Sequence, residues 1–485
     1  MKKMNLLVMS LVSAAALSFT SCSSNDDLAG DNAGQAKVDG FYMTLNVQTP
    51  KSDGTRTVVN NPTDATAEES DVTSGTIYLV DATGKVVFTK QITESDWKSG
   101  KPTQGNDGST QIKIEVDKVV AGQTYKVYFL ANADSKDPLN STFSTTATTD
   151  NKFVGNYAKA NNFAMFNQND TQVDGNGYTV TFIKANNNEA NPAKVNYKTI
   201  PNAPIKVERV VARIDAPTTS KSTVLADAPA DASAALKVAM MDAKEKVKSI
   251  ELTNYAISNL ANKSYVMQNW NSSALVIPDD KEGFSYIQPT AAFGDNYTYQ
   301  NGGFTTTEAT KVNYVFENYS KTAPTTMYFE YQIKLDDSKF TGAADFEDGT
   351  FYRYNNVIYT SFAQIFEDYK DVTNLFGEGK NAGTMKTELT NAIKDETELA
   401  KFRKDYKIEV FKGGKTYYKQ VIKDQYLTYE NAIQRNSIYR LNVKNIFNVG
   451  AQVPNGEPTE NEFYYINVTV SVNPWVLNSY DVNLQ

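Results

Sequence analysis

Histidine is absent from the chain, and cysteine occurs once, at Cys22, among 485 residues. Without histidine, Ser-His-Asp and Cys-His catalysis, histidine metal clusters and imidazole pH switching are excluded. A single cysteine excludes intrachain disulfides, thiolate zinc sites and a CxxC redox pair. A hydrolase built on two carboxylates would still be possible, but the 56 acidic residues are spread along the chain and no spacing singles out a pair. We therefore expect no enzyme, no cofactor and no metal site.

Basic residues are also outnumbered, which leaves a net charge of −8 at pH 7. Phosphate binding needs a basic face, so nucleic acid is not an expected partner. The 29 tyrosines and 24 phenylalanines, with many valines and threonines, favour half-buried pleated strands over helix bundles. The composition predicts an all-β protein, and the length has room for two or three domains.

The first 21 residues, MKKMNLLVMSLVSAAALSFTS, have the layout of a secretion signal. Lysines precede an apolar stretch from Leu6 to Phe19, which is short for a membrane span, and small residues lead up to Cys22. FTSC resembles the lipobox of a bacterial lipoprotein, in which that thiol is acylated. The alternative is an unmodified cysteine in an ordinary signal peptide. Residues 22–40 are acidic, small and without periodicity, which indicates a flexible tether.

Apolar residues with a period of two begin at residue 41 and predict a strand with one face on a core. The inward residues are Phe41, Met43, Leu45 and Val47, and the outward residues are Tyr42, Thr44, Asn46 and Gln48. Further strands are expected at 76–80 and 85–89 around the turn DATGK, and at 111–116, 125–132 and 178–183.

Residues 134–177 are rich in Asn, Asp, Ser and Thr, so we expect long surface loops there. NQNDTQVDGNG in this region could bind calcium through its oxygens, but it lacks the EF-hand spacing, and a solvated loop is the favoured interpretation. The Asn- and Pro-rich residues 184–204 predict a domain boundary.

A second set of strands is expected from residue 205, where IKVERVVARIDA begins. Apolar residues at helical spacing predict short helices within 361–370 and 384–406, and residues 225–246 are expected to be an insertion, helical or disordered. Behind a linker, two strands separated by Pro474 are predicted to close the chain, because proline cannot donate a ladder hydrogen bond. Their apolar residues are Ile466, Val468, Val470 and Val472, then Trp475, Leu477, Tyr480, Val482 and Leu484.

These features together resemble the Mfa1/FimA-type major fimbrial subunits, or fimbrillins, of Porphyromonas and Bacteroides relatives. The resemblance rests on FTSC, VERVVAR at 207–213, RNSIYRLNVKNI at 435–446, and the terminal INVTVSVNPWVLNSYDVNL, which points to the Mfa1 branch. It implies export as an outer-membrane lipoprotein, two tandem transthyretin-like β-sandwich domains with short helical insertions in the second, and cleavage after an arginine by an Arg-specific surface protease.

The resemblance also implies how such subunits assemble. The cut frees the first strand, and a carboxy-terminal strand of a neighbouring copy fills the vacated groove by donor-strand exchange. The product is the shaft of a type V fimbria at the cell surface, which supports adhesion and works with accessory anchor and tip subunits. The implied segments are a signal peptide (1–21), a tether (22–40), a propeptide with the removable strand (41–56), two domains (57–204 and 205–454), and a linker with donor strands (455–485).

The chain has a matching cleavage site. Arg56 is its first arginine and Arg209 its second, so an Arg-specific protease acting near the amino terminus has one target, the bond to Thr57. The site lies in PKSDGTRT, a segment of the kind that proteases nick, although a solvated loop arginine is the plain alternative. Cys22 and the strand from Phe41 lie on the same side of this bond, so one cut would remove both lipid and strand.

Other interpretations stay open on sequence alone. Both terminal strands could be ordinary sandwich strands that remain in their own subunit. The chain could also stay anchored as a surface lipoprotein that binds glycan or protein ligands through aromatic-rich loops, or it could be an anchor or tip subunit of a fimbria.

Overall fold

The computed structural model of the chain describes twelve stretches, all of which lie in the compact unit Gly40–Gln485. These are residues 40–48, 63–102, 109–145, 154, 157–168, 177–184, 187–217, 224–271, 274–287, 312–424, 427–453 and 466–477. Strands dominate this part of the chain, with short helices between them, so the predicted all-β class is confirmed. Cys22, Arg56, Thr57, Tyr480, Val482 and Leu484 lie outside the described residues.

Eleven of the described strands form the first sheet, in the order β14-β12-β7-β11-β15-β1-β6-β5, with β13 beside β1, β3 beside β7 and β4 beside β3. Side chains of β1 and β6 share one core with those of β3 and β7, so two parts of the sheet pack face to face as in a sandwich. Strand β15 joins the parts, because it pairs with β1 and with β11. The strands are β1 (Phe41–Gln48), β3 (Gly75–Val80), β4 (Val86–Ile92), β5 (Lys101–Pro102), β6 (Ser109–Val116), β7 (Thr124–Ala131), β11 (Met165–Asn167), β12 (Tyr178–Thr181), β13 (Ala193–Lys194), β14 (Asn196–Tyr197) and β15 (Ile205–Arg209).

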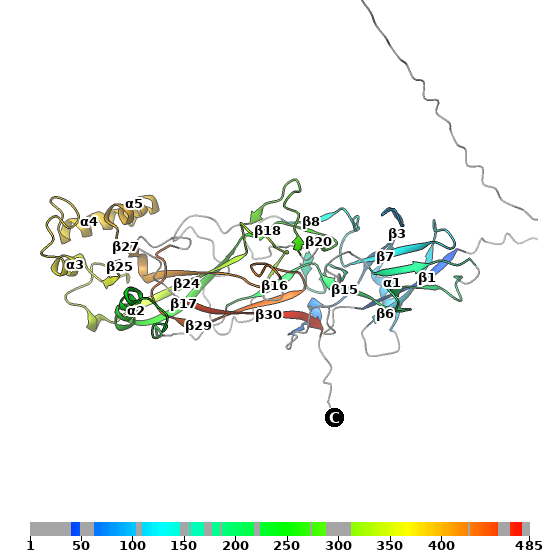
Figure 1. The fold of residues 1–485 in the computed structure, drawn as a ribbon, viewed down its shortest axis with the longest axis horizontal. Helices are drawn as coiled ribbons and strands as arrows, with labels where there is room; N and C mark the ends of the chain where they lie inside the picture. Colours follow the sequence, from blue (N-terminus) through cyan, green and yellow to red (C-terminus); the bar gives the residue numbers. More distant parts are fainter. Residues whose placement is uncertain are drawn as a thin grey trace, which may run out of the picture. The chain divides into compact units, whose positions relative to one another are not determined.

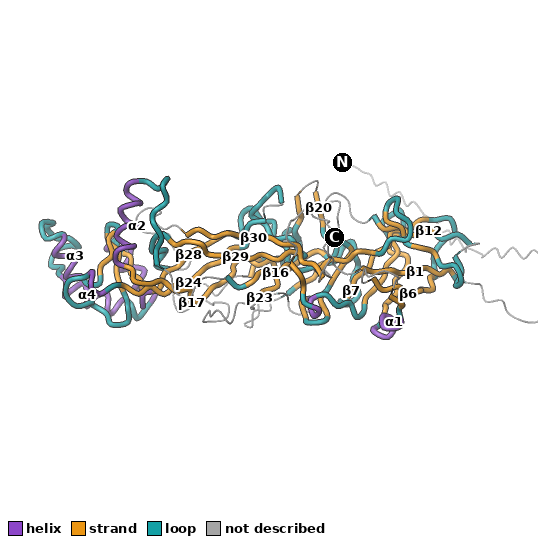
Figure 2. Tube along the Cα trace, turned by 90° about the horizontal axis from the view of Figure 1, so that it is seen from below, coloured by secondary structure: helices purple, strands orange, loops and turns teal. Residues whose placement is uncertain are grey.

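A second sandwich follows, built from a five-stranded and a three-stranded sheet around its own core. Figures 1 and 2 show β29 and β30 side by side in the first of these, and β17 beside β24 in the second. The sheets are β2 (Thr63–Ala65), β30 (Ile466–Leu477), β29 (Ser437–Ile446), β16 (Ala212–Asp215) and β23 (Val312–Val315), and then β17 (Val247–Ser258), β24 (Thr326–Leu335) and β28 (Lys415–Val421).

A third core belongs to the insertion between β24 and β28. The predicted helices are present there as α3 (Phe362–Asp368), α4 (Ala382–Ala392) and α5 (Glu396–Tyr406), and they cover the small sheet β26 (Val357–Tyr359), β25 (Phe351–Tyr354) and β27 (Glu409–Phe411). Each helix begins at a side-chain cap, namely Ser361, Asn381 or Asp395, which satisfies an amide of the first turn. The insertion at 225–246 is helical, as α2 (Ala234–Lys246).

Smaller elements complete the described structure. A short helix, α1 (Glu94–Ser99), follows β4. Two-stranded pairs are β8 (Thr142–Ser144) with β19 (Lys263–Tyr265), β9 (Ala158–Lys159) with β10 (Asn162–Phe163), β18 (Leu260–Ala261) with β22 (Tyr286–Ile287), and β20 (Asn269–Asn271) with β21 (Ala274–Val276). Single 3₁₀ turns are η1 (Ala67–Glu69), η5 (Asp337–Lys339) and η6 (Lys412–Gly414).

The prediction of long surface loops at 134–177 is wrong for part of this region. The described residues of this region include four short strands, and β11 lies inside the first sheet between β7 and β15 with Met165 and Phe166 buried. Residues 169–176, which make up most of NQNDTQVDGNG, lie outside the described residues. Asn167 explains how a polar sequence fits inside the sheet. Its side-chain oxygen accepts a hydrogen bond from the Phe129 amide at 2.7 Å, and its amide group donates to the Val127 carbonyl at 2.9 Å, so a buried asparagine satisfies the backbone of β7.

Candidate functional site

Strand β1 lies in the interior of the first sheet, with a neighbour along each edge. It pairs antiparallel with β6 over all eight residues, from Phe41 opposite Val116 to Gln48 opposite Ser109. On its other edge it runs parallel to β13 near Met43 and to β15 near Val47. The first strand of the chain is therefore held by two ladders, and its removal would open a slot between β6 and the pair β13 and β15.

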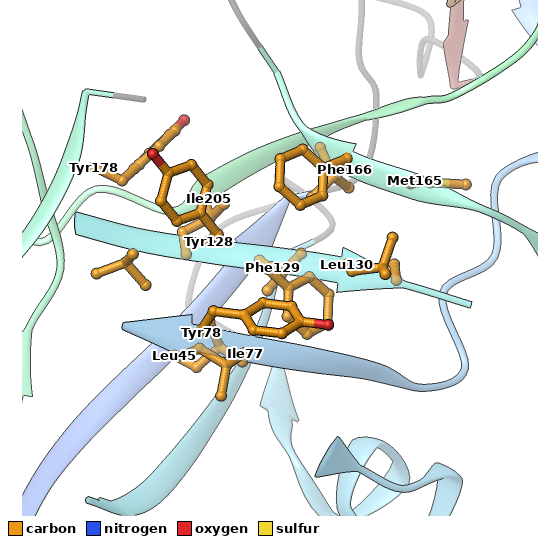
Figure 3. Packing of buried hydrophobic residues seen from close by; sticks show 14 of the residues in the cluster. Leu45, Ile77, Tyr78, Tyr128, Phe129, Leu130, Met165, Phe166, Tyr178 and Ile205 are labelled. Atoms are coloured by element: carbon orange, nitrogen blue, oxygen red, sulfur yellow. The ribbon is translucent and has the colours of Figure 1, made fainter. Parts of the chain in front are cut away.

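The inward face of β1 agrees with the predicted pattern. Met43 and Leu45 are 0% exposed and Val47 is 1% exposed. Figure 3 shows Leu45 in this core together with Ile77, Phe129 and Ile205. Phe41 is only partly buried and packs on Phe182, with 5.5 Å between the ring centroids. The three fully buried side chains contribute about 1.5–3 kcal/mol each to holding the strand.

The outward face of β1 differs from the expectation of a solvent-facing surface. Thr44, Asn46 and Gln48 are only 8%, 6% and 8% exposed, although all three are polar. The side-chain oxygen of Asn46 is buried and has no hydrogen-bond partner among the described residues. A buried acceptor left in this way costs on the order of 1–3 kcal/mol. The strand thus combines a well-packed inner face with one buried acceptor on its outer face, Asn46 Oδ1, that lacks a partner among the described residues.

The slot that β1 fills has apolar walls that the sequence did not identify. Ile112 and Ile114 of β6 are 8% and 1% exposed, and Ile205 and Val207 of β15 are 0% and 1% exposed. All of them belong to the same core as the inward residues of β1. A strand with apolar residues at a period of two matches this environment, because alternate side chains of a strand point to the same face.

The carboxy-terminal strand β30 is one continuous strand in the described structure. Residues 466–474 pair antiparallel with β29 of the same chain, from Ile466 opposite Ile446 to Pro474 opposite Ser437. The predicted interruption at Pro474 is wrong, since β30 continues through it and Trp475–Leu477 pair parallel with Thr63–Ala65 of β2. A proline is compatible with a strand where its nitrogen is not needed for the ladder.

Arg209, at the end of β15, ties the chain just after β2 to the second sandwich. Its guanidinium is fully buried, and its Nε donates to the Glu69 carbonyl at 2.6 Å. Its Nη2 donates to the Ser70 hydroxyl at 2.9 Å, and its Nη1 donates to the side-chain oxygen of Asn436 at 3.1 Å. One side chain thereby joins residues 69–70, the end of the first sheet and the start of β29.

A second contact at the same place centres on the Glu69 carboxylate. It pairs with Arg213 at 3.0 Å and accepts the Tyr314 hydroxyl at 2.8 Å. Burial alone would raise the pKa of this carboxyl, but the charge of Arg213 and hydrogen bonds from the Thr66 amide and the Tyr314 hydroxyl hold that pKa below its ordinary value. The carboxylate is therefore charged at neutral pH and joins the turn after β2 to Arg213 of β16 and Tyr314 of β23.

Sequence reasoning missed this junction. Its only signal was two arginines, Arg209 and Arg213, in the otherwise apolar VERVVAR, and their partners come from distant parts of the chain. The described residues contain no group of three or more acidic, histidine or cysteine side chains that could hold a metal ion. Within the same residues, no helix is long and apolar enough to cross a membrane.

Known protein families match two segments of this chain, one mainly in the first sandwich and one mainly in the second. Residues 42–209, from β1 to the end of β15, match the family described as major fimbrial subunit protein (FimA). Residues 409–481, which include β28, β29 and β30, match the family described as major fimbrial subunit protein type IV, fimbrillin, C-terminal. Two segments of the chain therefore match fimbrillin families. The chain's place in the Mfa1 branch stays a prediction. A comparison with curated protein sequences finds no match.

Solved structures similar to this chain include three from Parabacteroides distasonis. A candidate cell adhesion protein of Parabacteroides distasonis aligns with a TM-score of 0.42 and 15% identity over 92% of this chain and 100% of that one. A second one from the same species aligns with a TM-score of 0.42 and 12% identity over 90% and 99%. A fimbrial assembly protein of that species has a TM-score of 0.31 and 13% identity over 61% and 85%. These values are too low to support a functional comparison.

Proposed function

We propose that this chain is a non-enzymatic shaft subunit of a surface fimbria that polymerises after loss of strand β1. The chain is exported as a lipoprotein on Cys22, an Arg-specific protease cuts after Arg56, and a carboxy-terminal strand of a neighbouring copy enters the slot beside β6. Accessory anchor and tip subunits of the fimbria are the further expected partners. The observation that carries the proposal is that the strand amino-terminal to Arg56 occupies the interior of a sheet.

The position of β1 makes its removal consequential. Loss of an edge strand would expose one new ladder, whereas loss of β1 uncovers the edges of β6 and of β13 and β15 together. It also uncovers the core around Ile114 and Ile205. Exposed strand edges beside an apolar slot favour addition of another strand. A copy from which β1 has been cut away therefore exposes strand edges and apolar surface that favour binding of a neighbour.

The fold also supports a single cut. Besides Arg56 the sequence has six arginines, and all of them lie in described structure. Four have buried side chains, and Arg213 and Arg440 are partly covered within strands β16 and β29. Proteases need an exposed segment that can be drawn into an extended conformation, which these positions do not offer. They are Arg209, Arg213, Arg353, Arg403, Arg435 and Arg440.

The amino-terminal residue of assembled material tests the proposal. Mass spectrometry of fimbriae sheared from cells is expected to show a chain that begins at Thr57, because the cut releases everything up to Arg56. A shaft protein that still carries an acylated Cys22 would instead indicate an anchored lipoprotein or an accessory subunit, and the proposal would be wrong.

A pair of core substitutions tests whether β1 is absent from the polymer. Leu45→Ala is expected to lower the free energy of unfolding of the uncleaved chain by about 2–5 kcal/mol, since a fully buried leucine is removed. It is expected to leave the heat stability of assembled fimbriae unchanged. Ile114→Ala on β6 is the matched control, because Ile114 lines the slot in both states and should weaken both. Denaturant unfolding of the precursor and the temperature at which polymer dissociates in detergent measure the two effects.

A further inference from the structure

Residues 187–192 lie along the edge of β1 opposite β6. The Asn187 carbonyl accepts a hydrogen bond from the Tyr42 amide at 3.0 Å, so the segment begins beside the start of the strand. It ends where β13 pairs with Met43 and Thr44 along the same edge. Between these points Glu189 contacts Lys113, which belongs to the strand on the other edge of β1.

Glu189 reaches across β1 to the far neighbour. Lys113 stands opposite Thr44 on β6, and it points outward because Ile112 and Ile114 on either side of it face the core. The Lys113 Nζ lies 3.3 Å from the Glu189 carboxylate and 3.3 Å from its carbonyl oxygen. Since β6 and the approach to β13 flank opposite edges of β1, this contact bridges the strand at Thr44.

The bridging segment has a defined shape of its own. The side-chain oxygen of Asn188 accepts hydrogen bonds from the amides of Ala190 and Asn191, each at 3.0 Å, which closes a tight turn next to Glu189. Thr44, which stands opposite Lys113, is 8% exposed. Strand β1 therefore has the core below it, a strand on each edge, and the Lys113–Glu189 contact across its outward side at Thr44.

We propose that residues 187–192, joined to Lys113 through Glu189, form a clasp that must open before β1 can leave the slot. This inference rests on the proposed exchange of β1 and adds the step that controls when β1 can leave. A strand seated on a core leaves toward the opposite side, and that side is where the clasp lies. Cleavage after Arg56 and opening of the clasp are then two separate steps, and the second one sets the rate of exchange.

The clasp is built to open without unfolding the sandwich. The Lys113 and Glu189 side chains are 47% and 68% exposed, and ion pairs of this kind contribute little to stability. The strand beneath also presents Asn46, whose side-chain oxygen lacks a partner among the described residues. Glu189→Gln is accordingly expected to speed assembly by no more than about fivefold, whereas a covalent closure should stop it.

A cross-link tests the clasp. The full chain with Cys22→Ser, Lys113→Cys and Glu189→Cys has two thiols, which a short bismaleimide joins over β1. After treatment with an Arg-specific protease, the linked protein is expected to be cut at Arg56 but to retain the fragment that contains β1 on size-exclusion chromatography. Its polymer yield on unheated gels should fall at least about twentyfold below that of the same variant without linker.

The matched control places the same linker away from β1. Glu94 and Lys98 form an exposed ion pair on α1, at 2.6 Å, so Glu94→Cys with Lys98→Cys in the Cys22→Ser background undergoes the same chemistry without enclosing the strand. Equal polymer yield from linked and unlinked 113/189 protein would overturn the clasp and leave the proposed function intact. Failure of every cleaved protein to polymerise, unlinked ones included, would overturn the proposed function itself and the clasp with it.

Discussion

A chain with Arg56→Ala is expected to form no polymer and to remain on the cell surface with its lipid. The substitution removes the only arginine between Cys22 and Arg209, so an Arg-specific protease has no site in that part of the chain. Strand β1 then stays between β6 and its parallel neighbours, and no slot opens for another copy. Unheated gels of surface protein, which separate polymer ladders from monomer, measure the loss, and mass spectrometry measures the retained acyl group on Cys22.

Lys51→Ala is the matched control for this experiment, because it removes a basic residue from the same segment and leaves Arg56 intact. It is expected to give normal ladders. Ladders of normal length from the Arg56→Ala chain would show that assembly does not depend on cutting there, and the role proposed for β1 would have to be abandoned.

A chain that ends at Pro458 is expected to lose polymerisation completely, although cleavage at Arg56 should proceed. It lacks β30 and all residues beyond it, so it has a slot but no strand to offer. Because β30 also pairs with β29 in its own chain, a truncated protein could fail through instability of the second sandwich instead. Mixing truncated and full-length chains separates these two causes. A folded truncated chain can accept a strand but offers none, so it stops growth of the polymer that it joins. When about one chain in ten is truncated, the ladders of the full-length chain should therefore shorten, whereas an unfolded truncated chain would leave them unchanged.

A chain that ends at Leu477 then shows which part of the tail is the donor. It keeps all of β30, whose residues 466–474 are already hydrogen-bonded to β29, and loses Tyr480, Val482 and Leu484. We expect it to fail as a donor as well, because the residues beyond 477 supply apolar side chains at a period of two without breaking that ladder. Normal growth from this chain would mean that β30 itself separates from β29 and enters the neighbour.

The local features of this fold were predictable because they depend on short-range pattern. The period of two at 41–48 predicted β1 and its inward residues, and the turn at Asp81 predicted the hairpin of β3 and β4. Apolar residues at helical spacing predicted α4 and α5. In each case the residues that specify the element lie within the element itself.

The wrong predictions have a different cause, because they depend on contacts between distant parts of the chain. Asn167 was assigned to a loop because asparagine is common in loops, yet β7 offers it a backbone amide and a carbonyl that no local pattern reveals. Thr44 and Asn46 were assigned to the outward face of β1, but both are buried, and Glu189, about 140 positions later, contacts Lys113 across the strand at Thr44. Pro474 was expected to end a strand, but β30 continues past it because Trp475–Leu477 pair with β2.

Composition, periodicity and residue order predict the all-β class, the period-two pattern of the first strand and the position of Arg56 after it, since these are local properties of the sequence. The folded structure is needed to show that β1 is an interior strand, that Ile112, Ile114, Ile205 and Val207 share its core, that Arg209 and Glu69 hold the junction, and that Glu189 contacts Lys113 across β1. These facts depend on which distant segments become neighbours, and burial and pairing between them arise only when the whole chain has folded.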